Sequence, residues 1–245
     1  MTRFIKLFTN IINMSSRDKF ETFKNVFDNK TLLTLFKLSS DGYFEELKSP
    51  ISIGKESNVF NAVKKDGSLV CVKIYRVNAC DFRKMYQYIA HDPRFSGLQK
   101  KRRQIIKAWA QREYRNLLVA REAGADVPTP YAVRDNVLVL EFIGDKEAAP
   151  KLKDKEPEDY KKFSNQIIKN IKILYKKGFV HGDLSEYNIL NYKDKAILID
   201  LSHGVKLESP NSQELLERDI KNVERYFLKR KIKMDVQKIL KEMKK

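Results

Sequence analysis

The sequence has 245 residues and a mass of 28.7 kDa, and its hydrophobic content of 42% is enough for a folded core in one large domain or two small lobes. It contains no uncharged apolar run long enough to cross a membrane, and Lys6, Thr9, Asn10 and Asn13 interrupt the apolar start of the chain, which argues against a signal peptide. The two cysteines, Cys71 and Cys80, cannot form a disulfide framework and show no metal-ligand spacing. We therefore expect a cytoplasmic protein.

The formal net charge is +17, from 49 Lys and Arg against 32 Asp and Glu. Residues 221–245 hold ten basic and three acidic side chains, and a second basic run comprises Lys100, Lys101, Arg102, Arg103 and Lys107. Such clusters suit a polyanionic partner such as RNA. A lysine-rich, soluble surface explains the charge equally well.

The first predicted elements are two short helices within residues 20–49, after which "SSDGYFEELKSP" breaks the helical pattern. From Ile51 onward, residues 51–77 predict two or three short strands, and Asp66-Gly67 predicts a hairpin. A β-rich lobe is thus expected to begin at Ile51.

Residues 104–123 predict a helix ended by Gly124, and a strand pair follows, with its second member at 137–142. The 39 residues between Lys73 and Glu113 predict a solvated, flexible insertion, with RNA contact or autophosphorylation at Ser96 as the alternatives. Beyond the first lobe, which ends near Ile143, a helix over 158–177 is capped by Gly178. A hairpin around Asp194-Lys195 and helices over 211–229 and 234–244 complete a helical second lobe.

The stretch "VHGDLSEYNIL", residues 180–190, places Asn188 five positions after Asp183, which is the spacing of a kinase catalytic loop. An Asp can orient the nucleophile or accept its proton, and an Asn oxygen can ligate Mg²⁺. Alone, both residues are more often turn formers. Asp200 ends the apolar run "AILID", where a carboxylate is costly to bury unless a cation meets it, so it is a candidate Mg²⁺ ligand. For His181 we prefer a structural role in this loop to proton transfer.

Lys73 is the one charged residue in "LVCVKIY" and is a candidate ligand of the α and β phosphates of a nucleotide. Glu113 on the following helix is the expected partner of its ammonium group, and Glu122 is the alternative. The segment "IGKESNVF", residues 53–60, lies where a phosphate-covering loop belongs, although it has only one glycine. The side chains expected at the nucleotide are Ile53 and Val59, sandwiching adenine, with Lys55, Ser57 and Asn58 along the pocket. Backbone groups of Glu141 and Ile143 are expected at the adenine edge.

Taken together, "GKESNVF", "VCVKIYR", "DPRF", "REYRNL", "HGDLSEYN" and "IDLSHGV" resemble the signatures of the RIO family of atypical serine/threonine protein kinases, and of its type-one, archaeal-like subfamily. The resemblance implies an α+β, bilobal protein-kinase-like fold with an N-terminal helical extension (1–50), a β-rich N-lobe (51–143) and a reduced helical C-lobe (144–245). It implies ATP with Mg²⁺ or Mn²⁺, and catalysis by Asp183, Asp200 and Lys73, with Asn188 and Asp200 on the metal. It also implies a role in small ribosomal subunit maturation, on a pre-40S or 30S-type particle and its RNA, without a membrane partner or DNA sequence readout.

Two departures from ordinary protein kinases bear on mechanism. Position 185 is Ser, where most protein kinases place a Lys on the γ-phosphate, and only 45 residues follow Asp200, which leaves little room for a peptide-docking subdomain. We therefore expect hydrolytic turnover in an ATP-driven switch, and the resemblance makes Asp200 the residue that accepts phosphate. The alternatives are a small-molecule phosphotransferase of the aminoglycoside or choline kinase type and a non-catalytic ATP-binding assembly factor.

Overall fold

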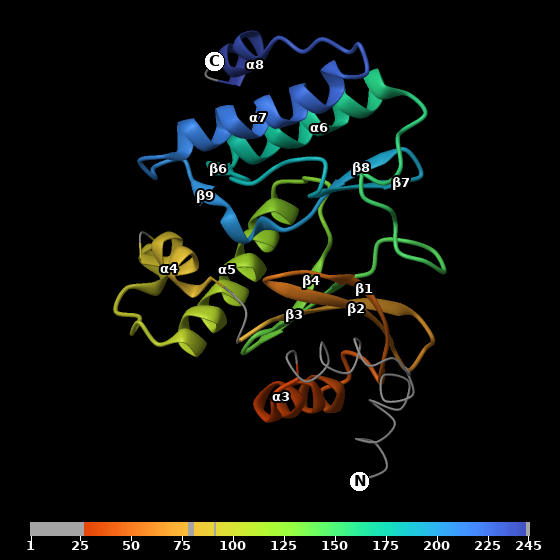
Figure 1. Ribbon diagram of the computed structural model, residues 1–245, viewed down its shortest axis with the longest axis vertical. Coiled ribbons are helices and arrows are strands. Elements are labelled where there is room, and N and C mark those ends of the chain that lie inside the picture. Colours follow the sequence, from red (N-terminus) through yellow and green to blue (C-terminus); the bar gives the residue numbers. More distant parts are fainter. Residues whose placement is uncertain (1–26, 78–80, 91, 244–245) are drawn as a thin grey trace. The chain divides into compact units, whose positions relative to one another are not determined.

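The structure, a computed structural model, describes residues 27–77, 81–90 and 92–243. The chain divides into two compact units (Figure 1). Of the described residues, the first comprises those up to Tyr114 together with 130–142, and the second comprises 115–129 and those from Ile143 onward. Among the described residues, no helix combines the length and apolar character that crossing a bilayer requires.

The first unit is built on a five-stranded antiparallel sheet with the strand order β1-β2-β3-β5-β4. Its strands are β1 (Glu46–Ile53), β2 (Ser57–Val63), β3 (Leu69–Tyr75), β4 (Pro130–Arg134) and β5 (Val137–Glu141). The predicted hairpin at Asp66-Gly67 is confirmed: Asp66 accepts a hydrogen bond from the Ser68 amide at 2.9 Å, and Gly67 adopts a φ of +82° that favours glycine.

Helix α3 (Asn29–Ser40) covers one face of this sheet (Figure 1). It begins where the Asp28 side chain accepts a hydrogen bond from the Thr31 amide at 2.8 Å, an N-cap that satisfies one free helix amide. Leu35 and Leu38 are fully buried in the core that α3 shares with the strands. The other expected helix lies partly in residues 20–26, outside the described residues.

The sheet begins earlier than predicted, since β1 starts at Glu46 rather than near Ile51. Leu47 is fully buried against the sheet core, opposite Ala62 of β2. Pro50, which suggested a break, lies where the β1–β2 register shifts, and such a bulge tolerates a residue without an N–H group.

The segment between β3 and α5 (Arg102–Glu122) differs from the expected solvated insertion. It contains helix α4 (Phe82–Ala90) and the 3₁₀ turn η1 (Pro93–Phe95). Met85 and Ile89 of α4 are buried in a core with Trp109 of α5, because their spacing of four places both on one face of the helix. Helix α5 begins in the first unit, and its last residues belong to the second.

The second unit packs α6 (Tyr160–Lys176), α7 (Ser212–Leu228) and α8 (Val236–Met243) together (Figure 1). Its two-stranded sheets pair β6 (Phe179–Val180) with β9 (Val205–Lys206) and β7 (Ile189–Tyr192) with β8 (Lys195–Leu198). The β7–β8 hairpin turns at Lys193-Asp194, one residue before the predicted pair, and both turn residues have positive φ. This is the backbone geometry of a two-residue hairpin turn.

Candidate active site

The first unit holds a buried ion pair between Lys73 of β3 and Glu113 of α5. The Lys73 Nζ lies 2.9 Å from Glu113 Oε1, and the two side chains are only 7% and 1% exposed. The other carboxylate oxygen of Glu113 accepts a hydrogen bond from the Tyr75 hydroxyl, a partner that sequence reasoning missed. The alternative partner, Glu122, instead lies 3.6 Å from Lys177 in the second unit. Lys73 is thus held in one orientation by a carboxylate that is itself fixed.

The strand register decides which side chains share a face with Lys73. Val59 of β2 lies directly opposite Lys73, so both project from the same face of the sheet. Ile53 is paired with Asn58. Because alternate residues of a strand point to the same face, Asn58 shares its face of the sheet with Phe60 and Ala62, which are buried against α3. This register differs from the expected adenine sandwich, because it places Ile53 and Val59 on opposite faces.

The loop between β1 and β2 is a tight turn rather than a long glycine-rich flap. The Gly54 amide donates to the Ser57 carbonyl at 3.0 Å, and a Cβ at Gly54 would lie 2.9 Å from that oxygen, so the close approach requires glycine. Arg76 donates to the Gly54 carbonyl at 3.2 Å. Lys55 is exposed and Ser57 half-buried.

The expected adenine-edge residues lie at and just beyond the end of β5. Glu141 is the last residue of that strand and is paired with Val70. Ile143 belongs to the second unit, where its carbonyl accepts a hydrogen bond from the Ala149 amide at 2.8 Å. Their contact with a nucleotide remains a prediction.

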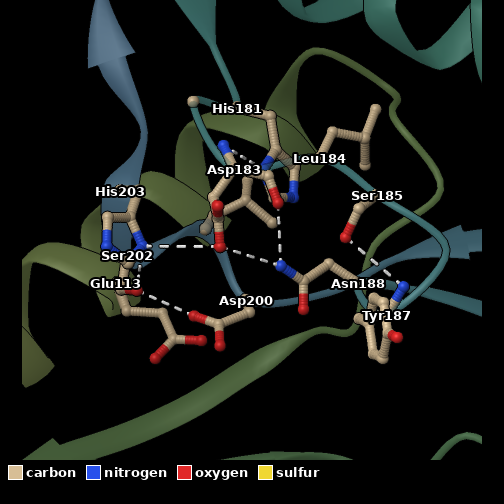
Figure 2. Close-up of polar contacts among 12 residues, drawn as sticks. Glu113, His181, Asp183, Leu184, Ser185, Tyr187, Asn188, Asp200, Ser202 and His203 are labelled. Atoms are coloured by element: carbon tan, nitrogen blue, oxygen red, sulfur yellow. Dashed lines mark hydrogen bonds and ion pairs between the residues drawn. The ribbon is translucent and has the colours of Figure 1, made fainter. Parts of the chain in front are cut away.

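In the second unit, Asn188 is hydrogen-bonded to Asp183, the residue five positions before it (Figure 2). The Asn188 side-chain amide donates to the Asp183 carbonyl at 2.8 Å and to Asp183 Oδ2 at 3.2 Å. Within the described chain, the Asn188 amide oxygen accepts no hydrogen bond, so it is available as a metal ligand. The Asp183 side chain is 53% exposed, which leaves its carboxylate accessible to a substrate.

Asp200 follows β8 and has a strained backbone. Its φ of +62° and ψ of +64° lie in the left-handed region that non-glycine residues avoid, and such strain gathers at functional sites. One carboxylate oxygen accepts a hydrogen bond from the Ser202 hydroxyl at 2.7 Å (Figure 2). The amide of the preceding residue, Ile199, donates to the Asn188 carbonyl at 3.0 Å. The two predicted metal ligands are therefore joined through adjacent backbone.

His181 also connects the loop around Asp183 to the segment that precedes Asp200. It is buried, and desolvation lowers its pKa to about 4, so the ring is neutral at neutral pH. The Asp183 amide donates to the Nδ1 of His181 at 3.4 Å (Figure 2). The Nε2 of the same ring lies 3.0 Å from the Ile199 carbonyl. A neutral ring with both nitrogens engaged fits the structural role. A second histidine, His203 of η2 (Leu201–His203), has its Nδ1 4.0 Å from Asp183 Oδ2.

Three residues of α7 hold the loop of the predicted catalytic residue Asp183, and no local pattern in the sequence pointed to them. The amides of Gly182 and Leu184, on either side of Asp183, donate to the two carboxylate oxygens of Asp219 at 2.7 and 2.9 Å. The loop carbonyls are bound by Arg218, which donates to Gly182, and by Asn222, which donates to Leu184. Burial raises the pKa of Asp219 to about 7, against the lowering effect of the two amides.

Asn116 of α5 holds the loop that carries Asp200. This fully buried side chain donates to the carbonyls of Leu201 and Gly204 at 2.8 and 3.2 Å. Both carbonyls lie in the turn that follows Asp200, around η2 (Leu201–His203). Asn116 was not singled out from the sequence, because its partners are more than eighty residues away.

The donor set fits Mg²⁺ or Mn²⁺. Asn188 and Asp200 supply hard oxygen ligands from two joined loops, and no cluster of three His, Cys, Asp or Glu side chains occurs among the described residues. Mg²⁺ in nucleotide-dependent enzymes is held by one or two protein oxygens together with substrate phosphates and water. These residues therefore suit a metal that arrives with a nucleotide rather than one in an all-protein cage.

Comparison with known proteins identifies the family. The family model described as the RIO domain matches residues 58–239, most of the chain. The chain belongs to the RIO family. The RIO-type serine/threonine-protein kinase Rio1 of Haloferax volcanii is 39% identical over 217 residues, which cover 88% of this chain and 75% of that protein. Rio1 of Methanocaldococcus jannaschii is 42% identical over 214 residues, with coverage of 86% and 73%.

The fold agrees with this RIO membership. The crystal structure of the Rio2 kinase–ADP/Mg²⁺–phosphoaspartate complex from Chaetomium thermophilum matches with a TM-score of 0.67 and 22% identity, over 86% of this chain and 65% of that one. The expected α+β, protein-kinase-like fold is thus confirmed. The chain is a protein kinase of the RIO type, which decides against the aminoglycoside or choline phosphotransferase alternative.

Proposed function

We propose that this RIO kinase uses ATP and Mg²⁺ in a hydrolytic switch that serves maturation of the small ribosomal subunit. The observation that carries the proposal is the connection of Asn188 and Asp200 through Ile199, beside an exposed Asp183 carboxylate. Oxygen ligands held in this way suit the Mg²⁺ of a nucleotide triphosphate. The Rio2 kinase complex from Chaetomium thermophilum, with ADP, Mg²⁺ and phosphoaspartate, supports the same chemistry.

Each catalytic residue has a separate task in this proposal. Lys73, oriented by Glu113, binds the α and β phosphates, and Asp183 orients the nucleophile and accepts its proton. Asn188 and Asp200 hold the metal, which, when bound, offsets the charge that develops on the phosphates. The adenine is bound by Val59, on the Lys73 face of the sheet, together with backbone groups of Glu141 and Ile143, while Lys55 and Ser57 lie along the phosphates.

We also propose that Asp200 is transiently phosphorylated. A carboxylate oxygen of Asp200 bonds to the γ-phosphorus, the bond from that phosphorus to the β–γ bridging oxygen breaks, and ADP leaves with the electron pair. Water then attacks the phosphorus of the acyl phosphate and gives up its proton to Asp183. Inorganic phosphate is released and the Asp200 carboxylate is restored.

Two features favour hydrolysis over phosphorylation of a bound peptide. Ser185 replaces the cationic side chain that most protein kinases direct to the γ-phosphate. Between Asp200 and α7 the chain forms only η2, β9 and a short turn, so the segment that receives a peptide in ordinary kinases is short. The net charge of +17 supports an RNA-containing partner in the cytoplasm, and we take that partner to be an immature small-subunit particle.

The test is ATP turnover by the purified full chain with Mg²⁺, with and without small-subunit particles that carry immature RNA. We expect Asp183→Ala and Asp200→Ala to lower kcat on the order of a hundredfold or more, whereas Asp194→Ala, in the β7–β8 turn, leaves it unchanged. A phosphorylated wild-type chain that loses its label in hydroxylamine, and an unlabelled Asp200→Ala chain, would support the acyl phosphate.

The outcomes separate the parts of the proposal. Turnover stimulated by the particles supports the switch. ATP turnover without a hydroxylamine-sensitive label would support the ATPase activity and contradict the acyl phosphate intermediate. Tight ATP binding without turnover, alone or with particles, would make the chain a non-catalytic assembly factor.

A further inference from the structure

The second unit has a groove bordered by α6, the turn that follows α7, and α8. It has a volume of about 470 Å³. Five lysines line it, and we call it the lysine groove: Lys161, Lys172, Lys231, Lys233 and Lys238. The two acidic side chains among the lining residues, Asp235 and Glu242, are fewer than the lysines.

Both acids already have local partners. Glu242 lies 2.7 Å from the Lys172 ammonium group, and Asp235 accepts a hydrogen bond from the Lys238 amide at 2.9 Å at the start of α8. Lys161, Lys231, Lys233 and Lys238 make no ion pair with any residue that the structure describes. The groove therefore presents uncompensated positive charge.

The positive surface continues along α6. A shallower hollow of about 560 Å³ is lined by Lys161, Lys162 and Lys169, and its one acid, Asp159, caps the helix by accepting a hydrogen bond from the Lys162 amide at 2.8 Å. Lys161, Lys169 and Lys172 are spaced by eight and three residues, which places them on one side of α6, away from its buried apolar face. At 1.5 Å per residue, the stretch of α6 from Lys161 to Lys172 extends this surface over about 16 Å.

The lysines beyond α7 are held by a fixed turn rather than a loose loop. The Ile232 amide donates to the Phe227 carbonyl at 3.1 Å and the Lys231 amide to the Leu228 carbonyl at 3.0 Å. Lys231 itself has a φ of +63°. These bonds close the helix end in the manner of a left-handed C-cap, so the backbone at Lys231 and Ile232, next to Lys233, is fixed.

The lining chemistry distinguishes between classes of partner. No Trp, Tyr or Arg lines the groove, although these are the side chains that usually anchor protein interfaces. Its apolar residues, Ile168, Ile232, Met234 and Ile239, are only partly exposed, whereas a membrane-surface site needs large exposed apolar side chains. Spaced ammonium groups without an apolar anchor suit a chain of repeating monoanions.

We propose that the lysine groove and the adjoining face of α6 bind the phosphate backbone of RNA. This rests on the proposed function only in the choice of an RNA-containing partner, and it assigns that contact to a surface. Binding of this kind neutralises phosphates without reading bases, so it depends strongly on salt and weakly on sequence.

The test measures the binding of a short fluorescein-labelled single-stranded RNA by the full chain, by anisotropy at several salt concentrations. The groove variant, Lys169→Glu/Lys233→Glu/Lys238→Glu, changes one lysine of the adjoining α6 face and two lysines of the groove. The matched control is Lys146→Glu/Lys155→Glu/Lys206→Glu, which makes the same charge change at exposed lysines of the same unit that do not line the groove. We expect the groove variant to bind roughly tenfold more weakly or worse, with the slope of log K against log salt reduced by about 2.

Equal affinities of the groove variant and the control would overturn the proposal, whether both are weakened or neither. The proposal would also be overturned if the groove variant lost the wild type's binding to vesicles of phosphatidylcholine and phosphatidylserine but bound RNA as tightly as the wild type. The surface would then bind a membrane. Basal ATP turnover of both triple variants should match the wild type. The two proposals can fail separately. If the wild type and Asp183→Ala bind RNA equally and more tightly than the groove variant, but the wild type does not turn over ATP, RNA binding by the groove is supported and the proposed hydrolytic function fails.

Discussion

Asp219 fixes the backbone on both sides of Asp183, since its two carboxylate oxygens accept the amides of Gly182 and Leu184. In Asp219→Asn, an NH₂ group replaces one of the two carboxylate oxygens, and it then faces the N–H group of Gly182 or Leu184 without being able to accept its hydrogen bond. We expect kcat for ATP turnover to fall roughly 10- to 100-fold, because a shift of about 1 Å in a catalytic group has this effect, and ATP affinity to stay unchanged. Asp159→Asn, which alters another carboxylate–amide bond in the same unit, is the control. Equal losses in both variants would contradict a positioning role.

The same carboxyl group makes stability depend on pH. Burial raises the pKa of Asp219 from 3.8 to about 7, so the folded protein keeps a proton that the unfolded chain loses. The stabilising contribution is therefore complete below about pH 4 and is lost as the pH rises through about 7. We expect the free energy of unfolding of Asp219→Asn, relative to wild type, to increase from pH 5 to pH 8, as measured by urea denaturation. Parallel curves for the two proteins would contradict this titration.

Asn116 contacts the turn that follows Asp200, the predicted metal ligand, rather than the loop around Asp183. Asn116→Leu removes the hydrogen bonds that its side chain donates to the carbonyls of Leu201 and Gly204, at a cost of about 0.5–1.5 kcal/mol each, while the Leu201 carbonyl still accepts the Gly204 amide. We expect the Mg²⁺ concentration for half-maximal ATP turnover to rise about tenfold, since 1.4 kcal/mol corresponds to that factor. Asn170→Leu is the control, because Asn170 is an equally buried Asn whose side chain accepts the Asp126 amide. It should lower stability without changing the Mg²⁺ dependence.

At the scale of elements, α4 is attached to α5 through Arg112. This side chain is 2% exposed, donates to the Tyr88 carbonyl at 2.6 Å and lies 3.7 Å from Asp92, and burial lowers its pKa to about 10. Arg112→Met should lower the free energy of unfolding by about 1–3 kcal/mol, because the Tyr88 carbonyl loses this charged donor while Asp92 keeps Arg94. Hydrogen exchange should increase first in residues 82–90. An α4 as protected as in wild type would show that apolar packing alone holds it.

Local patterns in the sequence were enough to predict α5, α6 and the hairpins, because each is specified by periodicity and turn residues within a short stretch. The β7–β8 turn was misplaced by one residue, since the turn residues with positive φ are Lys193 and Asp194 rather than the predicted pair Asp194-Lys195. The residues around α4 looked polar and basic, and their few buried apolar positions were too sparse to reveal a packed helix. Asp219 and Asn116 were missed for a different reason: their partners lie 35 or more residues away in sequence.

Across the whole molecule, the region shared with the RIO family spans residues 58–239 and includes every predicted catalytic and metal-binding residue. Lys73 and Glu113 lie in one compact unit, and Asp183, Asn188 and Asp200 lie in the other. Each group is rigidly supported within its own unit, by Tyr75 in the first and by the α7 and α5 contacts in the second. Ligand binding is therefore best measured on the intact chain.

ATP with Mg²⁺ should stabilise the whole chain, since a ligand at a hundred times its Kd adds about 2.7 kcal/mol, or roughly 5–10 °C in Tm for a protein of this size. Asp200→Ala should reduce this shift in Mg²⁺, because a metal ligand is lost. In EDTA the order should reverse, with the variant stabilised at least as much as wild type by ATP, because the Asp200 carboxylate then repels the phosphates instead of bridging to them through a cation. Differential scanning fluorimetry in the two media measures both shifts. The same order in Mg²⁺ and EDTA would show that Asp200 affects ATP binding by a route other than the metal.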